Sequence, residues 1–361
     1  MVFPSSTLVR LCQCLGGNAP SNLDWMAVLE LANNTLTTPL LIDLVDQPDQ
    51  SIPRDVEAFV REIYRRNALR NEFLRAQLEE AVAALNERDV IPVLLKGSAI
   101  LATAAPQRRA TRIMADLDIL VEPDQMETAL RALSDLDYQS HFRTPPESRK
   151  QYIDLKRPRD VGMIDLHQAA PGPEYFYRSS GKLLEHCMPV SVGRGAAYLP
   201  TPTFQAFMLI IHDQFQDNDY WVGEADVRHL IELRDLANAA EGIDWNRLMS
   251  FAPGRLARNA IAKQLVALAE LLGVDVPVDL RKGSIPRLQF TRLLLQSRFP
   301  LARWPLLAVA LLDYGNYRNY RRELGADYQT DTRRNATLTL PRAYTLRHLF
   351  GLVSNHRIGK V

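Results

Sequence analysis

Two aspartates stand two residues apart at the start of an apolar run, in the stretch RIMADLDILV that covers residues 112–121. In an extended strand Asp116 and Asp118 point to the same side, because side chains alternate between the two faces. Two like charges held side by side repel, and burying either one without a partner is costly. Their spacing therefore suggests a cation-binding pair, since divalent ions would replace the repulsion with attraction.

The segment before this pair has features of a phosphate-binding turn. The apolar run VIPVLL (90–95) is followed by Lys96, Gly97 and Ser98, which predicts a strand that enters a tight turn before a helix starting near Ala99. Glycine lets a backbone approach phosphate closely, and the N-terminus of a helix favours anions. Lys96 would add a positive charge, although a lysine that only extends from a strand end to solvent is the alternative.

A third strand is predicted in the stretch MIDLH, where Asp165 and His167 share one side. Three carboxylates that converge at strand ends suit two Mg²⁺ ions, which prefer oxygen ligands and together can clamp a triphosphate while activating a hydroxyl. An Asp-x-Asp pair alone is common, and Asp165 pairing with an arginine is the ordinary alternative. The order along the chain of the Lys-Gly-Ser segment, the Asp-x-Asp pair and Asp165, each at the end of a predicted strand, favours a metal-binding site over these alternatives.

The composition limits the class of protein. The 361 residues suffice for two domains, and 43 Lys and Arg against 42 Asp and Glu give a net charge of +1. This balance argues against a protein that coats nucleic acid or anionic lipid through net charge. Three scattered cysteines favour a reducing compartment, with Cys12 and Cys14 as buried thiols. No signal peptide or membrane span is evident, so a cytoplasmic protein without membrane contact is expected.

The pattern of apolar and polar residues in the rest of the sequence is mostly typical of helices. Helices are predicted within residues 22–88, capped at Asp24, and again from about residue 203 onward, with Asp244 as a second cap. Between them, strands at 117–121, 152–157 and 162–167 predict a small α/β unit with a mixed sheet.

The segments VLLKGSAIL, RIMADLDILV and MIDLH resemble nucleotidyltransferases of the DNA polymerase beta-like superfamily, in particular an uncharacterised bacterial branch of it. The resemblance extends over residues 22–275. It implies an α/β (α+β) fold with a small mixed-sheet core at 89–200, an N-terminal helical region at 1–88, and a C-terminal helical domain with a basic tail at 201–361. The interval from Gly-Ser to Asp-x-Asp is longer than in the minimal superfamily pattern.

The resemblance also implies roles for individual residues. Asp116, Asp118 and Asp165 would be the catalytic carboxylates and the ligands of two Mg²⁺ ions, with Mn²⁺ as a substitute. The residues that would bind the nucleotide are Lys96, Gly97, Ser98 and Arg112. His167 would support Asp165 or touch the acceptor, and a hydrogen bond to the backbone is the alternative.

The implied reaction is Mg²⁺-dependent transfer of a nucleoside monophosphate from a nucleoside triphosphate to a hydroxyl of a small molecule, with release of pyrophosphate. Two alternatives stay open. One is the same transfer to tRNA or to a protein side chain, as a toxin would do, although the balanced charge disfavours nucleic acid. The other is a nucleotide-binding scaffold without catalysis. The sequence does not identify the acceptor or the base.

Several polar residues outside these motifs could have either a binding role or a structural role. In the helical domain, His212, Asp213, Arg228, His229 and Asp235 would line a cleft or form structural ion pairs, and ion pairs are favoured. Arg108 and Arg109 are expected to be solvated loop charges. The tail that contains Tyr314, Tyr317, Tyr320, Arg318, Arg321 and Arg322 is expected to pack as an amphipathic helix rather than to contact RNA.

Overall fold

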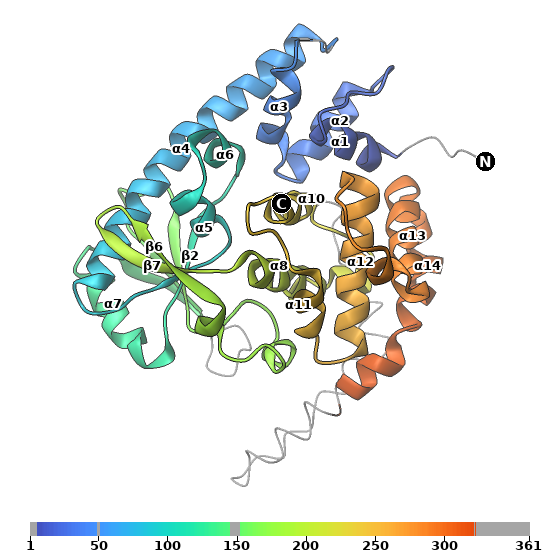
Figure 1. Cartoon of the computed structure of the whole chain (residues 1–361). Coiled ribbons are helices and arrows are strands. Elements are labelled where there is room, and N and C mark those ends of the chain that lie inside the picture. The colour runs from blue at the N-terminus through green and yellow to red at the C-terminus, as the bar shows by residue number, and fades with distance from the viewer. Residues whose placement is uncertain (1–5, 49–50, 145–151, 321, 323–361) are drawn as a thin grey trace.

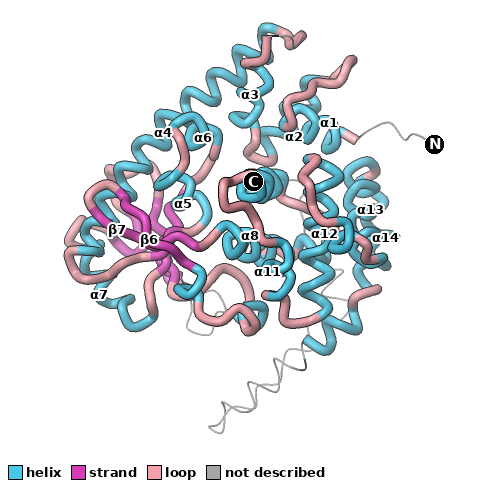
Figure 2. Tube along the Cα trace, viewed as in Figure 1, coloured by secondary structure: helices cyan, strands magenta, loops and turns pink. Residues whose placement is uncertain are grey.

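The computed structural model describes residues 6–48, 51–144, 152–320 and 322. A strand-rich part and a helical part lie side by side, and the long helix α4 runs along one side of the strands (Figures 1 and 2). Within the described ranges, no helix is both long and apolar enough to span a membrane.

The elements follow one another in three groups. The N-terminal helices are α1 (Thr7–Leu15), α2 (Trp25–Asn34), α3 (Ile42–Val45) and α4 (Arg54–Asn86). The strand-rich part contains β1 (Val93–Leu94), α5 (Lys96–Thr103), α6 (Pro106–Thr111), β2 (Asp116–Leu120), α7 (Met126–Ser134), β3 (Gln139–Arg143), β4 (Tyr152–Lys156), β5 (Met163–His167), β6 (Cys187–Val192) and β7 (Gly195–Pro200). The C-terminal helices are α8 (Pro202–Ile211), the π-helical turn η5 (His212–Gln216), α9 (Asp219–Val222), α10 (Val227–Ala237), α11 (Trp245–Ser250), α12 (Arg255–Leu272), α13 (Ser284–Arg298) and α14 (Arg303–Leu311).

The strands form one mixed sheet in the order β3-β4-β5-β2-β1-β7-β6. The central pair β2 and β5 is parallel, as is the pair β1 and β7, while the other neighbours are antiparallel. The predicted mixed α/β fold is therefore confirmed.

The alternation of side chains along β2 and β5 gives the sheet two different faces. On one face Leu117 and Ile119 join a buried core with Ile164, Leu166 and the second half of α4. On the other face Leu120 joins the core of the C-terminal helices. The aspartates of both strands alternate with the first set, so they lie on the face that looks toward the helical part.

Helix α4 connects two cores. At its start, Asp55 and Glu57 suit the positive end of the helix dipole, and Val56 and Val60 pack with the N-terminal helices. Its second half presents Leu74, Leu78, Ala81, Val82 and Leu85 to the sheet. The helix thereby supports the sheet from the face opposite the aspartates.

Several predicted elements are confirmed. Asp24 accepts a hydrogen bond from the backbone N–H of Ala27, and Asp244 accepts one from Arg247, so both act as N-caps. Cys12 and Cys14 are buried free thiols. Tyr317 packs against Trp221, and Tyr320 against Tyr175, with ring centroids 5.1 Å and 4.6 Å apart, which confirms packing for that part of the tail.

Other predictions were incomplete or wrong. Strands β3, β6 and β7 were not predicted, because they carry short or exposed patterns with weak alternation. The predicted strand at 90–95 is ordered as a strand only at Val93–Leu94, and Lys96 to Ser98 form the first turn of α5 rather than a separate turn. Arg321 and the basic segment 340–361 lie outside the described residues.

We expect the contact between α4 and the sheet to be a main source of stability. Leu78 is fully buried there, so Leu78→Ala should lower the free energy of unfolding by about 2–5 kcal/mol through lost burial and a cavity. Leu69→Ala is the matched control, because Leu69 is on the same helix and 57% exposed. Urea unfolding followed by circular dichroism measures both. Equal losses for the two variants would contradict the assigned role of this face.

Candidate active site

The strand register brings the three predicted carboxylates onto one face of the sheet. In the parallel pair β2 and β5, Asp118 lies directly opposite Asp165, and Asp116 is two residues before Asp118 on the same face. Asp118 is 3% exposed, whereas Asp116 and Asp165 are half-buried. The ligand atoms of Asp118, Asp165 and His167 all lie within 4.8 Å of one another. The structure therefore places these predicted site residues together.

Lys96 and His167 both hold Asp118. The Lys96 ammonium donates a hydrogen bond of 2.7 Å to Asp118 Oδ1, and His167 Nε2 lies 3.1 Å from the same oxygen. Burial opposes ionisation of Asp118, but the charges and hydrogen bonds of these two partners outweigh it, and the pKa of Asp118 lies below its ordinary value. The His167 ring thus contacts Asp118, and neither Asp165, which was the expected partner, nor a backbone group is its recorded hydrogen-bond partner in the described part of the chain.

The backbone of Lys96 is strained. Its φ of +46° lies in the left-handed region, which costs a residue other than glycine roughly 1–2 kcal/mol. The residue is the first of α5, one position after the N-cap Leu95, and its ammonium reaches Asp118. Strain of this kind at a polar cluster is typical of functional sites.

A fourth carboxylate, which was not predicted from the sequence, lies beside the other three. Asp154 on β4 pairs in register with Asp165 and shares a hydrogen bond with it. Burial, then the charges of Asp116, Asp118 and Asp154, raise the pKa of Asp165 to about 8. The signal was present in the sequence, because YIDLK at 152–156 repeats the Ile-Asp-Leu of MIDLH at 163–167.

The donor set suits divalent cations. Four carboxylates share one face of the sheet, and Lys96 is the cation hydrogen-bonded to them within the described ranges. Burial, and after it the charges of neighbouring aspartates, raises the pKa values of Asp116 and Asp165. Oxygen ligands with excess negative charge are what Mg²⁺ and Mn²⁺ bind in proteins.

Gly97 and Ser98, in the first turn of α5, have different surroundings. At Gly97 a Cβ atom would lie 3.0 Å from Met114 Sδ, so a larger residue there would press against the Met114 side chain. Ser98 is fully buried, and its hydroxyl has no hydrogen-bond partner in the described part of the chain. An unpaired buried hydroxyl is unfavourable, so Ser98 Oγ is a donor without an acceptor among the described residues.

Arg112 lies behind the carboxylates and pairs with the helical part. Its Nε is 2.7 Å from Glu232 Oε1 on α10, and both side chains are buried. Burial lowers the pKa of Arg112, while Glu232 and, more weakly, Asp118 act in the opposite direction. The predicted nucleotide-binding arginine is thus close enough to Asp118 to act on it by charge, and is itself held by an ion pair.

Arg108 and Arg109 correct one expectation. They lie half-buried on the helix α6 and form ion pairs: Arg108 pairs with Asp235 on α10, and Arg109 pairs with Glu72 on α4 at 3.1 Å. Arg228 pairs with Asp226 at 3.2 Å. The ion-pair reading of Arg228 and Asp235 is therefore confirmed.

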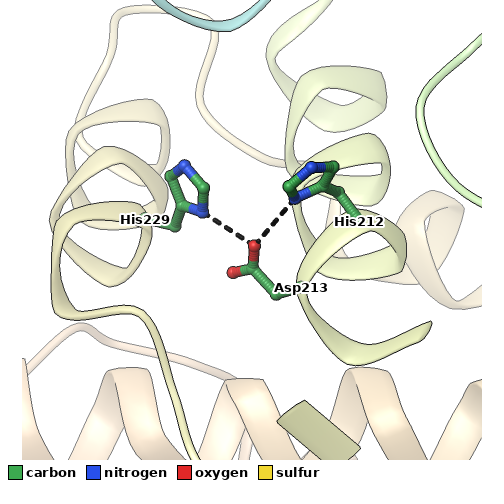
Figure 3. A group of neighbouring side chains, drawn as sticks. All are labelled: His212, Asp213 and His229. Atoms are coloured by element: carbon green, nitrogen blue, oxygen red, sulfur yellow. Dashed lines mark hydrogen bonds and ion pairs between the residues drawn. The ribbon is translucent and has the colours of Figure 1, made fainter. Parts of the chain in front are cut away.

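Two histidines of the helical part share one buried carboxylate (Figure 3). His229 Nδ1 lies 2.7 Å and His212 Nδ1 lies 3.3 Å from Asp213 Oδ1. Burial opposes the charge on His229, but Asp213 and Asp226 raise its pKa to about 8, so it is protonated beside the ionised Asp213. Burial, together with the charge of Lys96, lowers the pKa of His212. His212 begins the π-helical turn η5, a distortion common at functional sites.

A cavity of about 280 Å³ adjoins the carboxylates, between α5, α8 and α10. Its walls are mainly apolar and include Leu95, Ala99, Ile100, Met208, Leu209 and Leu236. Lys96 and His212 line it as well, so one end lies next to Asp118. The cavity therefore lies between the strand-rich part and the helical part, beside the carboxylates.

We expect the metal-free site to lose stability as pH rises. The pKa of Asp165 is about 8 in the folded protein against an ordinary 3.8, so folding is unimpeded below pH 4 and is penalised increasingly up to pH 8. In EDTA, Asp165→Asn should therefore raise the unfolding free energy at pH 8 by roughly 1–3 kcal/mol, allowing for screening, and change it little at pH 4. Urea titrations at both pH values test this. A variant less stable than the parent at pH 8 would contradict it.

The Arg112–Glu232 pair should matter for folding. Arg112→Ala leaves Glu232 charged and buried without its partner, and should cost about 3–5 kcal/mol. The double variant Arg112→Met/Glu232→Leu removes both charges and should recover most of that loss. Thermal or urea unfolding of the two variants measures the difference. Equal losses would mean that Arg112 acts through contacts other than Glu232.

Comparison with solved structures gives weak overall similarity to nucleotidyltransferases. The antibiotic-resistance factor ANT(2'')-Ia is 15% identical with a TM-score of 0.34, over 55% of this chain and 96% of that one. An antigenic nucleotidyltransferase-like protein from Paracoccidioides brasiliensis is 14% identical with a TM-score of 0.33, over 57% of this chain and 94% of that one. No curated protein matches the chain.

The sequence itself carries the assignment. Residues 21–273 match the family model described as uncharacterised nucleotidyltransferase. The matched segment includes α4, the whole sheet, the four carboxylates and the helices up to α12. The chain therefore belongs to this uncharacterised family of nucleotidyltransferases.

Proposed function

We propose that this nucleotidyltransferase moves a nucleoside monophosphate from a nucleoside triphosphate to a hydroxyl of a small molecule and releases pyrophosphate. The observation that carries the proposal is the register of β2 and β5, which sets Asp118 beside Asp165 with Asp116 on the same face. This set would hold two Mg²⁺ ions, or Mn²⁺ in their place. Bound ions would neutralise the triphosphate and favour ionisation of the acceptor hydroxyl.

The carboxylates differ in the roles they would take. Asp116 and Asp118 would be shared by the two metal sites, and Asp165 would complete one of them. Asp165 would also help to accept the proton that leaves the acceptor hydroxyl. Asp154 and His167 would position Asp165 and Asp118, because each is hydrogen-bonded to that partner.

The nucleotide would meet the start of α5. The Lys96 ammonium, now on Asp118, would turn to the phosphates once bound ions replace it. The unpaired hydroxyl of Ser98 would donate to a phosphate oxygen, and Gly97 would keep the backbone close. Arg112, held by Glu232, would contribute its charge without leaving its ion pair.

The triphosphate should bind only with metal. Calorimetric titration of the protein with ATP, CTP, GTP and UTP, each with and without Mg²⁺, should show binding that requires the ion. In the Asp116→Asn/Asp118→Asn variant this binding should fall at least tenfold, because two ligands of the ions are lost.

The matched control is Glu122→Gln/Asp124→Asn. It removes two negative charges from the exposed segment after β2, and should bind the nucleotide as the parent does. Absence of binding of every triphosphate by folded protein, with Mg²⁺ and with Mn²⁺, would contradict the proposed function.

A further inference from the structure

We propose that the cavity between α5, α8 and α10 is the acceptor site, and that it takes a small, uncharged, largely apolar molecule whose hydroxyl donates a hydrogen bond to His212 Nε2. This inference rests on the proposed function, because it names the substrate class for that reaction. The argument starts from the position of the cavity.

The cavity and the carboxylates share Lys96. The side chain lines one end of the cavity, and its ammonium is 2.7 Å from Asp118 Oδ1. Leu95, also in the wall, donates its backbone N–H to the carbonyl of Asp118. A molecule in the cavity would thus reach the edge of the proposed metal site. At the other end Thr103 and Ala239 are exposed, which provides a way in.

The charges around the cavity are already paired. Arg108 forms an ion pair with Asp235, and Glu232 forms one with Arg112. These pairs leave no free carboxylate in the wall for a polycation and no free guanidinium for a phosphate or an RNA backbone. Burying a charged acceptor there without a partner would be costly. An uncharged molecule is the class that fits.

The size and chemistry of the walls agree with this class. An apolar cavity of roughly 150 Å³ is enough for benzene. About 280 Å³, lined by Ala99, Ile100, Met208 and Leu209, therefore accommodates a substituted ring or a branched aliphatic chain. Burial of its apolar surface would provide most of the binding.

His212 supplies the polar contact. Its Nδ1 lies 3.3 Å from Asp213 Oδ1 and 3.4 Å from Asp217 Oδ2, so this nitrogen carries the proton. The neutral ring then has its lone pair on Nε2, for which the structure records no hydrogen bond among the described residues. His212 and Lys96 both line the cavity. An acceptor nitrogen in an apolar wall selects a hydroxyl, which can donate to it.

A nucleobase fits this wall less well. The edge of a base presents several donors and acceptors that need partners when buried. The charged side chains of the wall, Arg108, Glu232 and Asp235, are held in ion pairs, and Lys96 is held by Asp118. The uncharged polar groups are His212, the Thr103 hydroxyl, which donates to the carbonyl of Ala99, and Gln205, whose amide donates to the carbonyl of Pro200. We therefore assign the cavity to the acceptor and place the nucleoside outside it.

The test uses a matched pair of probes on the full chain. 4-Methylphenol and p-xylene have nearly the same shape, but only the phenol has a hydroxyl. With methyl-¹³C methionine, the Met208 signal reports on the cavity wall, and Met249 serves as a reference outside it. Both probes should shift the Met208 signal, and the phenol should bind roughly three- to tenfold more tightly through its hydrogen bond.

Two sets of variants locate the effect. Ala239→Trp fills the exposed end of the cavity and should abolish binding of both probes, while Ala240→Trp, at the next exposed residue and outside the wall, should not. His212→Leu should remove the preference for 4-methylphenol. Mg²⁺-dependent triphosphate binding should be the same in both tryptophan variants.

Three outcomes would overturn the acceptor site: no shift of Met208 with either probe, a phenol preference that survives His212→Leu, or loss of triphosphate binding in Ala239→Trp alone. The last result would place the nucleoside in the cavity. Triphosphate binding without probe binding contradicts the acceptor site only. Probe binding without any triphosphate binding contradicts the proposed reaction instead.

Discussion

The repulsion between carboxylates held on one face of a sheet is the constraint on which this structure depends. Asp116, Asp118, Asp165 and Asp154 are brought together by hydrogen-bonded register, so they cannot separate without breaking the ladder of β2, β5 and β4. The opposite face packs against α4, which secures the strands in place. The burial of apolar side chains on one face of the sheet thus offsets the repulsion between the carboxylates on the other face.

Lys96 partly neutralises that charge, and the chain bends to allow it. A lysine in the left-handed region at the junction of β1 and α5 is strained, yet it places an ammonium on Asp118. Burial, and then the charges of the other three aspartates, still raises the pKa of Asp165 to about 8 in the presence of Lys96. A site with this imbalance is prepared for further positive charge, which the proposed metal ions would supply.

The helical part completes the site through two ion pairs, one buried and one half-buried. Glu232 on α10 holds Arg112, and Asp235 on the same helix holds Arg108, so α10 anchors the chain segment that leads into β2. The same pairs remove free charge from the cavity wall, and Asp213 orients His212 within it. The contacts that join the two parts therefore also define what the cavity can bind.

Local patterns in the sequence determined much of this protein. The alternation in DLDIL and MIDLH placed Asp116, Asp118 and Asp165 on one face, and the caps at Asp24 and Asp244 marked two helix starts. Both rest on interactions between residues a few positions apart. Only the tertiary structure decided that Asp154 adjoins Asp165, that Arg112 pairs with Glu232 and that His212 and His229 share Asp213. The contacts of Asp154 with Asp165, His229 with Asp213 and Arg112 with Glu232 join residues 11, 16 and 120 positions apart, and depend on how strands and helices pack rather than on any local period.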